Sequence, residues 1–348
     1  MHILLVSRVR LNPYVSLLAH GLEQNGATAA VTPEFGLRTL WQARRQGVDV
    51  IHLHWLELLT AAPGPRRHAL RRRWLLGSLT LARRLGITTV YTVHNLAAHE
   101  PDQASLDGRD SAALFRVVDL VHVHDAATAT TVARQYDRTR GVYVVPHGNY
   151  IGAYPNGCTR SAARQRLGIG DGERVFLALG GIRPYKGIET LIDAFQALDQ
   201  PSARLLIAGH PHVPAYAAAI RARADRDPRI HLHLQHIPDG ALQYFFRASD
   251  ACVLPYRQAT TSGAAILALS FGCPIIAPDF DPFPPLAAAG RGVLYEADDP
   301  QGLLTALRAA AQLDQAAARA ACLAYAQTLD WQVLAGQHLA AYRSVRGS

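Results

Sequence analysis

Cysteine is scarce in this chain, and long apolar stretches are missing. The four cysteines, Cys158, Cys252, Cys273 and Cys322, lack the Cys-x-x-Cys spacing of redox and zinc motifs. No apolar run approaches the roughly 20 residues needed to span a bilayer, and the opening run, His2–Val6, is too short for a signal peptide. We therefore expect a cytoplasmic protein in a reducing compartment, beginning with a buried strand.

Acidic residues are also in short supply. The chain has 27 Asp and Glu against 35 Lys and Arg, a net charge of +8, which favours nucleic acid, anionic lipid or a phosphorylated metabolite as partner. The densest basic cluster also carries Trp and Leu. It predicts peripheral contact with the inner face of an anionic membrane through Arg66–Trp74, although an ordinary solvated face has the same composition. No nucleic-acid module is recognisable, so we expect no nucleic acid partner.

Short apolar runs alternate with longer amphipathic segments, the pattern of βα units and parallel sheets. A chain of 348 residues exceeds the roughly 250–300 at which single cores stop growing, so we expect two α/β domains. Turn residues predict a linker around 146–155. The first domain should span 1–152, the second 153–330, and residues 331–348 should cross back to the first. Strands are expected at 2–6, 27–31, 50–53, 88–93, 120–123, 142–145, 175–179, 204–208, 230–234, 251–254, 275–277 and 292–294.

One glycine turn carries two cations. Gly180–Gly187 follows the apolar run Val175–Leu179 and precedes the amphipathic segment Ile188–Leu198, so the order is strand, turn, helix. Glycines let the backbone approach a ligand, a helix start offers N–H groups to an anion, and Arg183 and Lys186 add positive charge. Such a turn can hold a diphosphate without a metal. A plain βα turn with solvated cations is the alternative.

These features resemble the GT-B glycosyltransferases over nearly the whole chain. Gly180–Gly187 is similar to the Gly-Gly-x-x-x-x-Lys-Gly diphosphate clamp of that family, and Leu206–Gly209, Ile237–Pro238, Ala248–Asp250 and Phe271–Pro274 follow in the family's order. The resemblance implies two doubly wound, Rossmann-like parallel-sheet domains facing a cleft. It implies an acceptor-binding first domain and a nucleotide-sugar-binding second domain.

Two glutamates that many retaining members carry before Gly-x-Pro are missing. Counted back from Pro274, their places hold Ala259 and Leu267, whose side chains cannot bond a sugar or ribose. Thr261–Gly263 instead offers hydroxyl and N–H groups to a phosphate at a helix start. Ordinary N-capping by Ser262 is the alternative, and both can hold. This segment is similar to the inverting β-mannosyltransferases of bacterial exopolysaccharide assembly, which use GDP-mannose and a lipid-linked oligosaccharide.

The resemblance implies an inverting glycosyltransferase that needs no cofactor or metal. It would move a hexose, mannose from GDP-mannose, to a glycolipid or other lipid-linked saccharide acceptor in polysaccharide synthesis. Two alternatives stay open: a UDP-sugar-dependent glycosyltransferase with another acceptor, and a nucleotide-sugar-binding subunit that has lost catalysis. The implied sites are a donor diphosphate site (Gly181, Arg183, Lys186, Tyr256, Thr261, Ser262 and Gly263), a nucleotide site (Gly209, His236 and Ile237) and an acceptor site (Asn12, His54, Trp55, Glu57 and Asn149).

An inverting transfer also needs a base, expected in the first domain at the carboxyl ends of its strands. Candidates are Glu57, His94, His99, Glu100 and Asp125. Glu100 is favoured, because the loop 94–100 carries an acid and imidazoles just beyond a strand. His99 and His94 follow, since an imidazole titrates near neutral pH.

Three His-x-His pairs, at 52/54, 122/124 and 231/233, raise the alternative of zinc, because alternation puts both rings on one face of a strand. No third ligand is evident in the sequence. We therefore expect these rings to form hydrogen bonds, and we expect no metal. Asp279-Phe280-Asp281 mimics a metal signature, but its neighbouring prolines predict a rigid loop.

Overall fold

The computed structural model describes residues 1–96 and 108–346, so two candidate bases, His99 and Glu100, lie outside the described residues. The chain divides into two compact units. Unit 1 comprises Met1–Gly148 and Leu329–Ser348, and unit 2 comprises Asn149–Thr328.

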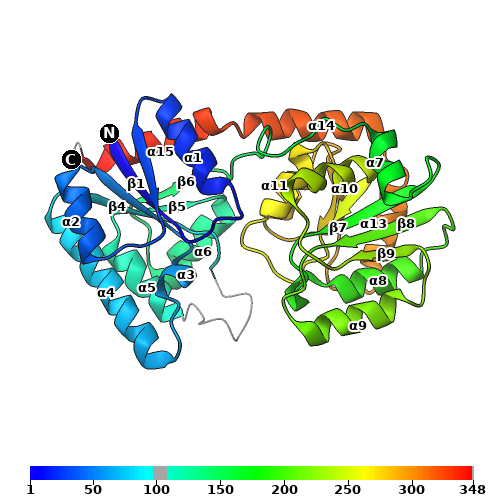
Figure 1. Cartoon of the computed structure of the whole chain (residues 1–348), viewed down its shortest axis with the longest axis horizontal. Coiled ribbons are helices and arrows are strands. Elements are labelled where there is room, and N and C mark those ends of the chain that lie inside the picture. The colour runs from blue at the N-terminus through cyan, green and yellow to red at the C-terminus, as the bar shows by residue number, and fades with distance from the viewer. Residues whose placement is uncertain (97–107, 347–348) are drawn as a thin grey trace. The chain divides into compact units, whose positions relative to one another are not determined.

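Unit 1 is built on a parallel six-stranded sheet of order β2-β1-β3-β4-β5-β6, with helices on both faces (Figure 1). α1 and α15 cover one face, and α2 to α6 cover the other. The strands are β1 (His2–Val6), β2 (Thr28–Thr32), β3 (Val50–His54), β4 (Thr88–Thr92), β5 (Leu120–Val123) and β6 (Val142–Val144). The helices are α1 (Tyr14–Gln24), α2 (Leu37–Arg45), α3 (Leu56–Thr60), α4 (Pro65–Arg84), α5 (Gly108–Val117), α6 (Ala126–Tyr136) and α15 (Trp331–Arg346).

The central strands β3, β4 and β5 are buried along their whole length, as expected for a parallel sheet covered on both faces. Successive side chains of a strand point to opposite faces. Ile51 and Leu53 therefore join the core under α2 to α6, whereas Val50 joins the core under α1 and α15. His52 and His54 share the face of Val50.

α15 completes unit 1 from the far end of the sequence. It packs along α1, where a Cβ on Gly21 would lie 2.5 Å from the carbonyl oxygen of Trp331, so glycine permits the close approach of the two helices. Trp331, Leu339 and Tyr342 belong to the same core as Leu18 of α1. The Asn25 amide, which donates to the Gln332 carbonyl at 2.8 Å, adds a polar contact between these helices.

Unit 2 repeats the architecture with a parallel sheet of order β12-β11-β10-β7-β8-β9. α8, α9 and α13 share one core with the sheet, and Figure 1 shows α7, α10, α11 and α14 on its other side. The strands are β7 (Arg174–Leu179), β8 (Ala203–Ala208), β9 (Ile230–His233), β10 (Ala251–Val253), β11 (Ile275–Pro278) and β12 (Gly292–Tyr295). The helices are α7 (Arg160–Leu167), η1 (Pro184–Lys186), α8 (Ile188–Gln196), α9 (Pro214–Ala224), η2 (Asp239–Ala241), α10 (Leu242–Ala248), α11 (Gly263–Ser270), α12 (Phe283–Ala287), α13 (Gly302–Ala310) and α14 (Gln315–Thr328).

The predicted fold class is confirmed, because every expected strand is present with ends that differ by at most one residue. Among the described residues, no helix combines the length and apolar character that a bilayer crossing requires.

Candidate active site

Unit 2 has a topological switch point between the neighbouring strands β7 and β10. From β7 the sheet is extended on one side by β8 and β9, and from β10 it is extended on the other side by β11 and β12. Ligands of open α/β sheets bind outside the carboxyl ends of the strands at such points. The loop after β7 is the glycine turn 180–187, and the loop after β10 runs from Leu254 to Ser262. The fold therefore brings the predicted donor residues of both loops to one edge of the sheet.

Close backbone packing explains the glycines of this edge. Gly180 and Gly209 have φ angles of +134° and +148°, and a Cβ on Gly209 would collide with the carbonyl of Gly180. A Cβ on Gly187 would collide with the carbonyl of Pro255, in the loop after β10. Glycine is needed at 187 and 209 because backbone meets backbone there, and at 180 because side chains rarely allow its positive φ.

The ammonium group of Lys186 lies at this edge, between Gly180 and the Tyr256 ring. Its Nζ lies 5.0 Å from the ring centroid of Tyr256, and a Cβ on Gly180 would lie 2.8 Å from it. Desolvation by burial lowers the pKa of Lys186. The second cation of the turn, Arg183, has its Nη2 3.4 Å from Nδ1 of His212.

Ser262 begins α11 as its N-cap and accepts a hydrogen bond from the Ala265 N–H at 3.2 Å, which confirms the capping alternative. It also hydrogen-bonds with Tyr256, whose pKa is raised by burial. The ring that faces Lys186 is thus fixed by the residue that caps α11. Gly263 is the first helical residue, and Thr261 precedes the cap.

The predicted nucleotide residues follow the neighbouring strands β8 and β9. Gly209 follows β8 and its N–H donates to the His233 carbonyl at 3.0 Å. His236 is exposed and Ile237 half-buried, in the segment that joins β9 to η2. Because β7, β8 and β9 are adjacent and parallel, all three residues lie at the same carboxyl edge as the glycine turn.

Unit 1 has its own switch point between β1 and β3. Asn12, after β1, accepts a hydrogen bond from the Tyr14 N–H at 2.9 Å and so fixes the start of α1. Trp55, directly after β3, has a φ of +50°, a left-handed conformation that is uncommon for a residue with a side chain. Backbone strain of this kind concentrates at functional sites. Asn149, in contrast, belongs to unit 2, where its amide donates to the Ala326 carbonyl at 2.8 Å.

Tyr14 is the centre of an aromatic and imidazole cluster at this edge of unit 1. Its side chain is fully buried. Six rings have centroids within 4.8 to 6.0 Å of the Tyr14 ring: His54, Trp55, His94, His124, His147 and Trp331. We call these seven residues the Tyr14 cluster.

His94, a predicted catalytic residue, is held within this cluster. Its Nε2 lies 3.1 Å from Nδ1 of His54, and its ring stacks on Trp55 with centroids 3.9 Å apart. Burial lowers the pKa of His94 well below its ordinary value. The imidazole is therefore neutral at pH 7, and burial opposes the positive charge that it would acquire as a base.

Two further histidines of the cluster are also neutral. His124 Nδ1 is 3.0 Å from the Val145 carbonyl, which can only accept, so Nδ1 carries the proton. Its Nε2 is then an acceptor, and it is buried without a hydrogen-bond partner among the described residues. Burial lowers the pKa of His147 to about 3.

Glu57 lies in the first turn of α3, where its Oε1 accepts from the Asn95 amide at 3.2 Å. The other oxygen, Oε2, is buried and has no partner among residues 1–96 and 108–346. Burial raises the pKa of Glu57. Asp125, another candidate base, caps α6 by accepting from the Thr128 N–H at 2.6 Å.

One histidine from each of the first two His-x-His pairs meets a third histidine from another element. His338 of α15 meets His52 and His122, and one ligand nitrogen from each lies within 4.8 Å of the others. Hydrogen bonds already occupy both nitrogens of His52, which contact Tyr342 and Thr92 at 2.7 Å, and the Nδ1 atoms of His122 and His338, which are 2.6 Å apart. Nε2 of His122 is buried and has no hydrogen-bond partner among the described residues. A metal that used His52 as a ligand would displace one of the hydrogen bonds of that ring.

Residues 173–312 match the family described as "Glycosyl transferases group 1". A GDP-mannose:glycolipid 4-beta-D-mannosyltransferase of Xanthomonas campestris pv. campestris is 30% identical over 344 residues, which cover 97% of this chain and 89% of that protein. The chain belongs to the group 1 glycosyltransferases. Its fold is GT-B. Sucrose-phosphate synthase from Thermosynechococcus elongatus superposes with a TM-score of 0.75 at 17% identity over 99% of both chains, and Anabaena Alr3699/HepE in complex with UDP-glucose superposes at 0.75 and 16% identity, over 99% of this chain and 100% of that one.

In this glycosyltransferase the family match spans every predicted donor and nucleotide residue. The structure gathers these residues at one edge of unit 2, and Asn12, His54, Trp55 and Glu57 at the corresponding edge of unit 1. Their individual roles stay predictions. Sequence reasoning assigned no role to Tyr14, His124, His147 and Trp331. The His-x-His alternation could have indicated His124, but Tyr14 and Trp331 come from helices whose packing the sequence does not reveal.

Proposed function

We propose that this glycosyltransferase is an inverting, metal-independent enzyme that transfers mannose from GDP-mannose to a lipid-linked saccharide in polysaccharide synthesis. The observation that carries the proposal is the 30% identity to the GDP-mannose:glycolipid mannosyltransferase over 97% of the chain. Donor binding is assigned to unit 2 and acceptor binding to unit 1. The acceptor's lipid would lie in the inner face of the cell membrane, which the enzyme contacts peripherally.

The donor half of the proposal rests on charge at the β7 and β10 loops. When the anomeric C–O bond breaks, the electron pair leaves with the diphosphate, and Arg183 and Lys186 neutralise the charge that develops there. Thr261 and Ser262, with the first N–H groups of α11, contact the distal phosphate. Side chains and backbone at this edge supply cations and donors, so the proposal includes no metal or other cofactor.

The acceptor half rests on the Tyr14 cluster and Glu57. In a single displacement the acceptor hydroxyl attacks the anomeric carbon while a base takes its proton, and the anomeric configuration inverts. Glu100 is the proposed base, with His99 and His94 as the other candidates. His54, Trp55 and Glu57 line the same edge, where an aromatic ring and a carboxylate suit a sugar's apolar face and its hydroxyls.

The test is a transfer assay with the purified full chain, GDP-mannose, a polyprenyl-diphosphate-linked oligosaccharide and a chelator. The expected result is release of GDP and a product with a β-linked mannose, shown by NMR. Transfer with retention would overturn the inverting mechanism, and loss of activity in chelator that added metal restores would overturn metal independence.

Donor identity needs a separate control. In thermal-shift titrations, GDP should raise the melting temperature of the chain at a lower concentration than UDP does, because a ligand stabilises the state that binds it. Preferential stabilisation by UDP, together with turnover of a UDP-sugar, would replace mannose transfer by a UDP-sugar-dependent reaction.

A further inference from the structure

α2 and α4 form a strongly basic surface of unit 1. α2 contains three arginines and α4 contains seven, and neither helix contains an aspartate or glutamate. Figure 1 shows the two helices on the same side of the unit 1 sheet, and residues of both line one pocket. The basic cluster at Arg66–Trp74 is therefore one part of a larger two-helix surface.

This surface also exposes large apolar side chains. Leu70 and Trp74 of α4 are 56% and 55% exposed, and Trp41 of α2 is 59% exposed. Along α4 the exposed apolar residues continue to Leu81, at a spacing of four and seven residues that keeps them on one helical face. A solvated basic face would not carry such a stripe, because water disfavours exposed tryptophan and leucine.

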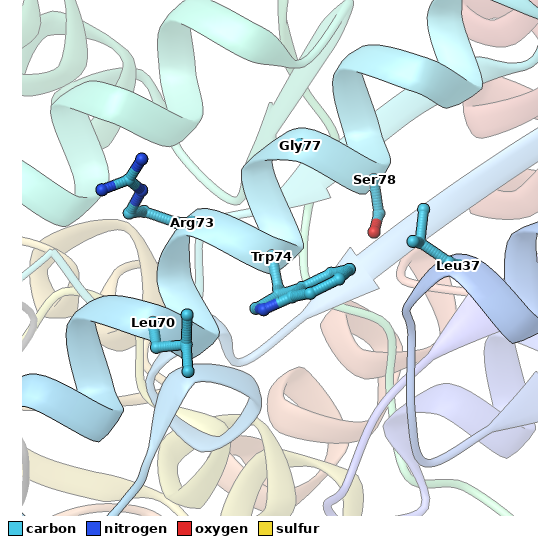
Figure 2. Close-up of a pocket in the computed structure, with 6 residues that line it drawn as sticks. All are labelled: Leu37, Leu70, Arg73, Trp74, Gly77 and Ser78. Atoms are coloured by element: carbon cyan, nitrogen blue, oxygen red, sulfur yellow. The ribbon is translucent and has the colours of Figure 1, made fainter.

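A pocket of about 350 Å³ opens on this apolar stripe between the two helices. Figure 2 shows the Trp74 indole lying along α4 toward Ser78, with Leu37 of α2 facing it. Leu70 lies one turn earlier, and Arg73 points away from the indole. Gly77 lines the same pocket, and a Cβ built on it would meet no atom within 4 Å, which leaves room for an apolar group.

Eight of the ten arginines of this surface are of two kinds; of the other two, Arg71 donates to the Ala61 carbonyl and Arg45 lies over the Trp41 ring, 4.6 Å from its centroid. Arg72 and Arg83 form ion pairs with Asp110 and Asp119, which anchor α4 to its neighbours. In contrast, the exposed arginines at 38, 44, 66, 67, 73 and 84 form no ion pair with a described residue. Their charge is available to an external anion.

We infer that α2 and α4 dock on an anionic lipid bilayer. Trp41, Trp74 and Leu70 enter the interface, lipid hydrocarbon occupies the pocket beside Trp74, and the unpaired arginines contact phosphate headgroups. Nucleic acid is disfavoured as a partner, because a phosphate backbone offers no apolar group to pack against the exposed apolar stripe. The inference rests on the proposed function only in placing the lipid-linked acceptor in the same bilayer, since docking itself needs neither donor nor catalysis.

The first experiment measures co-sedimentation of the full chain with phosphatidylcholine vesicles, with and without phosphatidylglycerol. Binding should require phosphatidylglycerol and weaken with salt. Replacing Leu70→Ala and Trp74→Ala together should lower partitioning roughly tenfold to a hundredfold, because both lose buried apolar area. The matched control, Leu323→Ala with Val333→Ala, alters exposed apolar residues elsewhere and should bind as the parent does.

Charge is tested by Arg67→Gln with Arg73→Gln, which should lower binding to anionic vesicles about tenfold or more. Arg134→Gln with Arg140→Gln removes the same charge from another exposed part of unit 1 and should change binding less than twofold or so. Circular dichroism of each variant shows whether it folds, and GDP binding, assigned to unit 2, reports separately on the proposed function.

Depth is tested with brominated lipids, which quench tryptophan near the acyl chains. The parent should be quenched, and Trp74→Phe should remove a large part of that quenching. The inference is overturned if the Leu70/Trp74 variant binds vesicles as the parent does, or if brominated lipids leave the emission unchanged. It is also overturned if duplex DNA displaces the chain from vesicles while the Leu70/Trp74 substitutions leave DNA binding intact, which would indicate a nucleic-acid surface.

Discussion

Lys186 is the only lysine among the 35 basic Lys and Arg residues of the chain. Its ammonium lies against the backbone of Gly180 and 5.0 Å from the Tyr256 ring centroid, in a space that a planar guanidinium would fit poorly. This placement accounts for a lysine in a protein that otherwise uses arginine.

Replacing Lys186→Met should weaken GDP binding about tenfold to a hundredfold, because a charge-assisted hydrogen bond contributes roughly 1.5–3 kcal/mol. Isothermal titration calorimetry measures the change. Lys186→Arg should recover only part of the affinity, and Arg221→Met, at an exposed position of α9, should bind as the parent does. If Lys186→Met binds GDP normally, the glycine turn does not hold the diphosphate.

Glu57 keeps one buried carboxylate oxygen without a partner among the described residues, and burial raises its pKa. Such an oxygen suits an acceptor hydroxyl. Glu57→Gln should raise the acceptor KM about tenfold while the donor KM stays within about twofold, because the amide still accepts from Asn95 but presents a neutral group. A steady-state assay with each substrate varied in turn checks this. Equal effects on both substrates would indicate a structural role for Glu57 instead.

At the scale of the elements, a layer of neutral histidines lies between the unit 1 sheet and α15. His52 and His122 come from β3 and β5, and His338 comes from α15; all are buried, with Tyr342 and Thr92 as polar neighbours. Burial lowers the pKa of each, and the pKa of His122 falls to about 3. In the unfolded chain these residues titrate near 6.5.

Acid should therefore destabilise unit 1. Between pH 6.5 and about 3 the unfolded chain binds protons on His122 that the folded chain does not, so the free energy of unfolding rises with pH in this window and is lost as pH falls. His52 and His338 shift in the same direction. The urea midpoint of the parent should decrease when the pH is lowered from 7.5 to 5.5. His122→Asn should make the midpoint depend less on pH, whereas His20→Asn, at an exposed position of α1, should leave the pH dependence unchanged. An equal slope in His122→Asn would show that this layer does not control the pH dependence.

The elements themselves were predictable from sequence, and their packing was less so. The short apolar runs between amphipathic segments located each strand to within one residue, because the residues of a parallel strand that is covered on both faces are apolar along its whole length. Strand order then placed Gly180–Gly187 and Ser262 at one edge of the sheet, as the family resemblance had implied. The Tyr14 cluster could not be read in this way, since it joins α1, the ends of four strands (β3, β4, β5 and β6) and α15. Its members have no common period or spacing in the sequence.

At the scale of the whole molecule, the chain passes from unit 2 back into unit 1 after Thr328. Trp331, at the start of α15, contacts Gly148, where an added Cβ would collide with the indole ring, and it also faces Tyr14. The residues of α15 are thus part of the core that supports the Tyr14 cluster. Unit 1 is complete only once the residues of α15 have been synthesised.

Ending the chain after Thr328 should therefore unfold unit 1 and leave unit 2 folded. The deletion removes Trp331, Leu339 and Tyr342 from a core that they share with α1, and each large buried side chain contributes roughly 2–5 kcal/mol, more than a typical domain can lose. Limited proteolysis with mass spectrometry should then cleave throughout 1–148 while 149–328 stays protected. Ending the chain after Arg343 instead removes only the last turn, with the Tyr143–Ser344 hydrogen bond and the Arg346–Asp49 ion pair, and should leave both units protected. Protection of 1–148 in the longer deletion would show that α1 and the sheet form a stable core without α15.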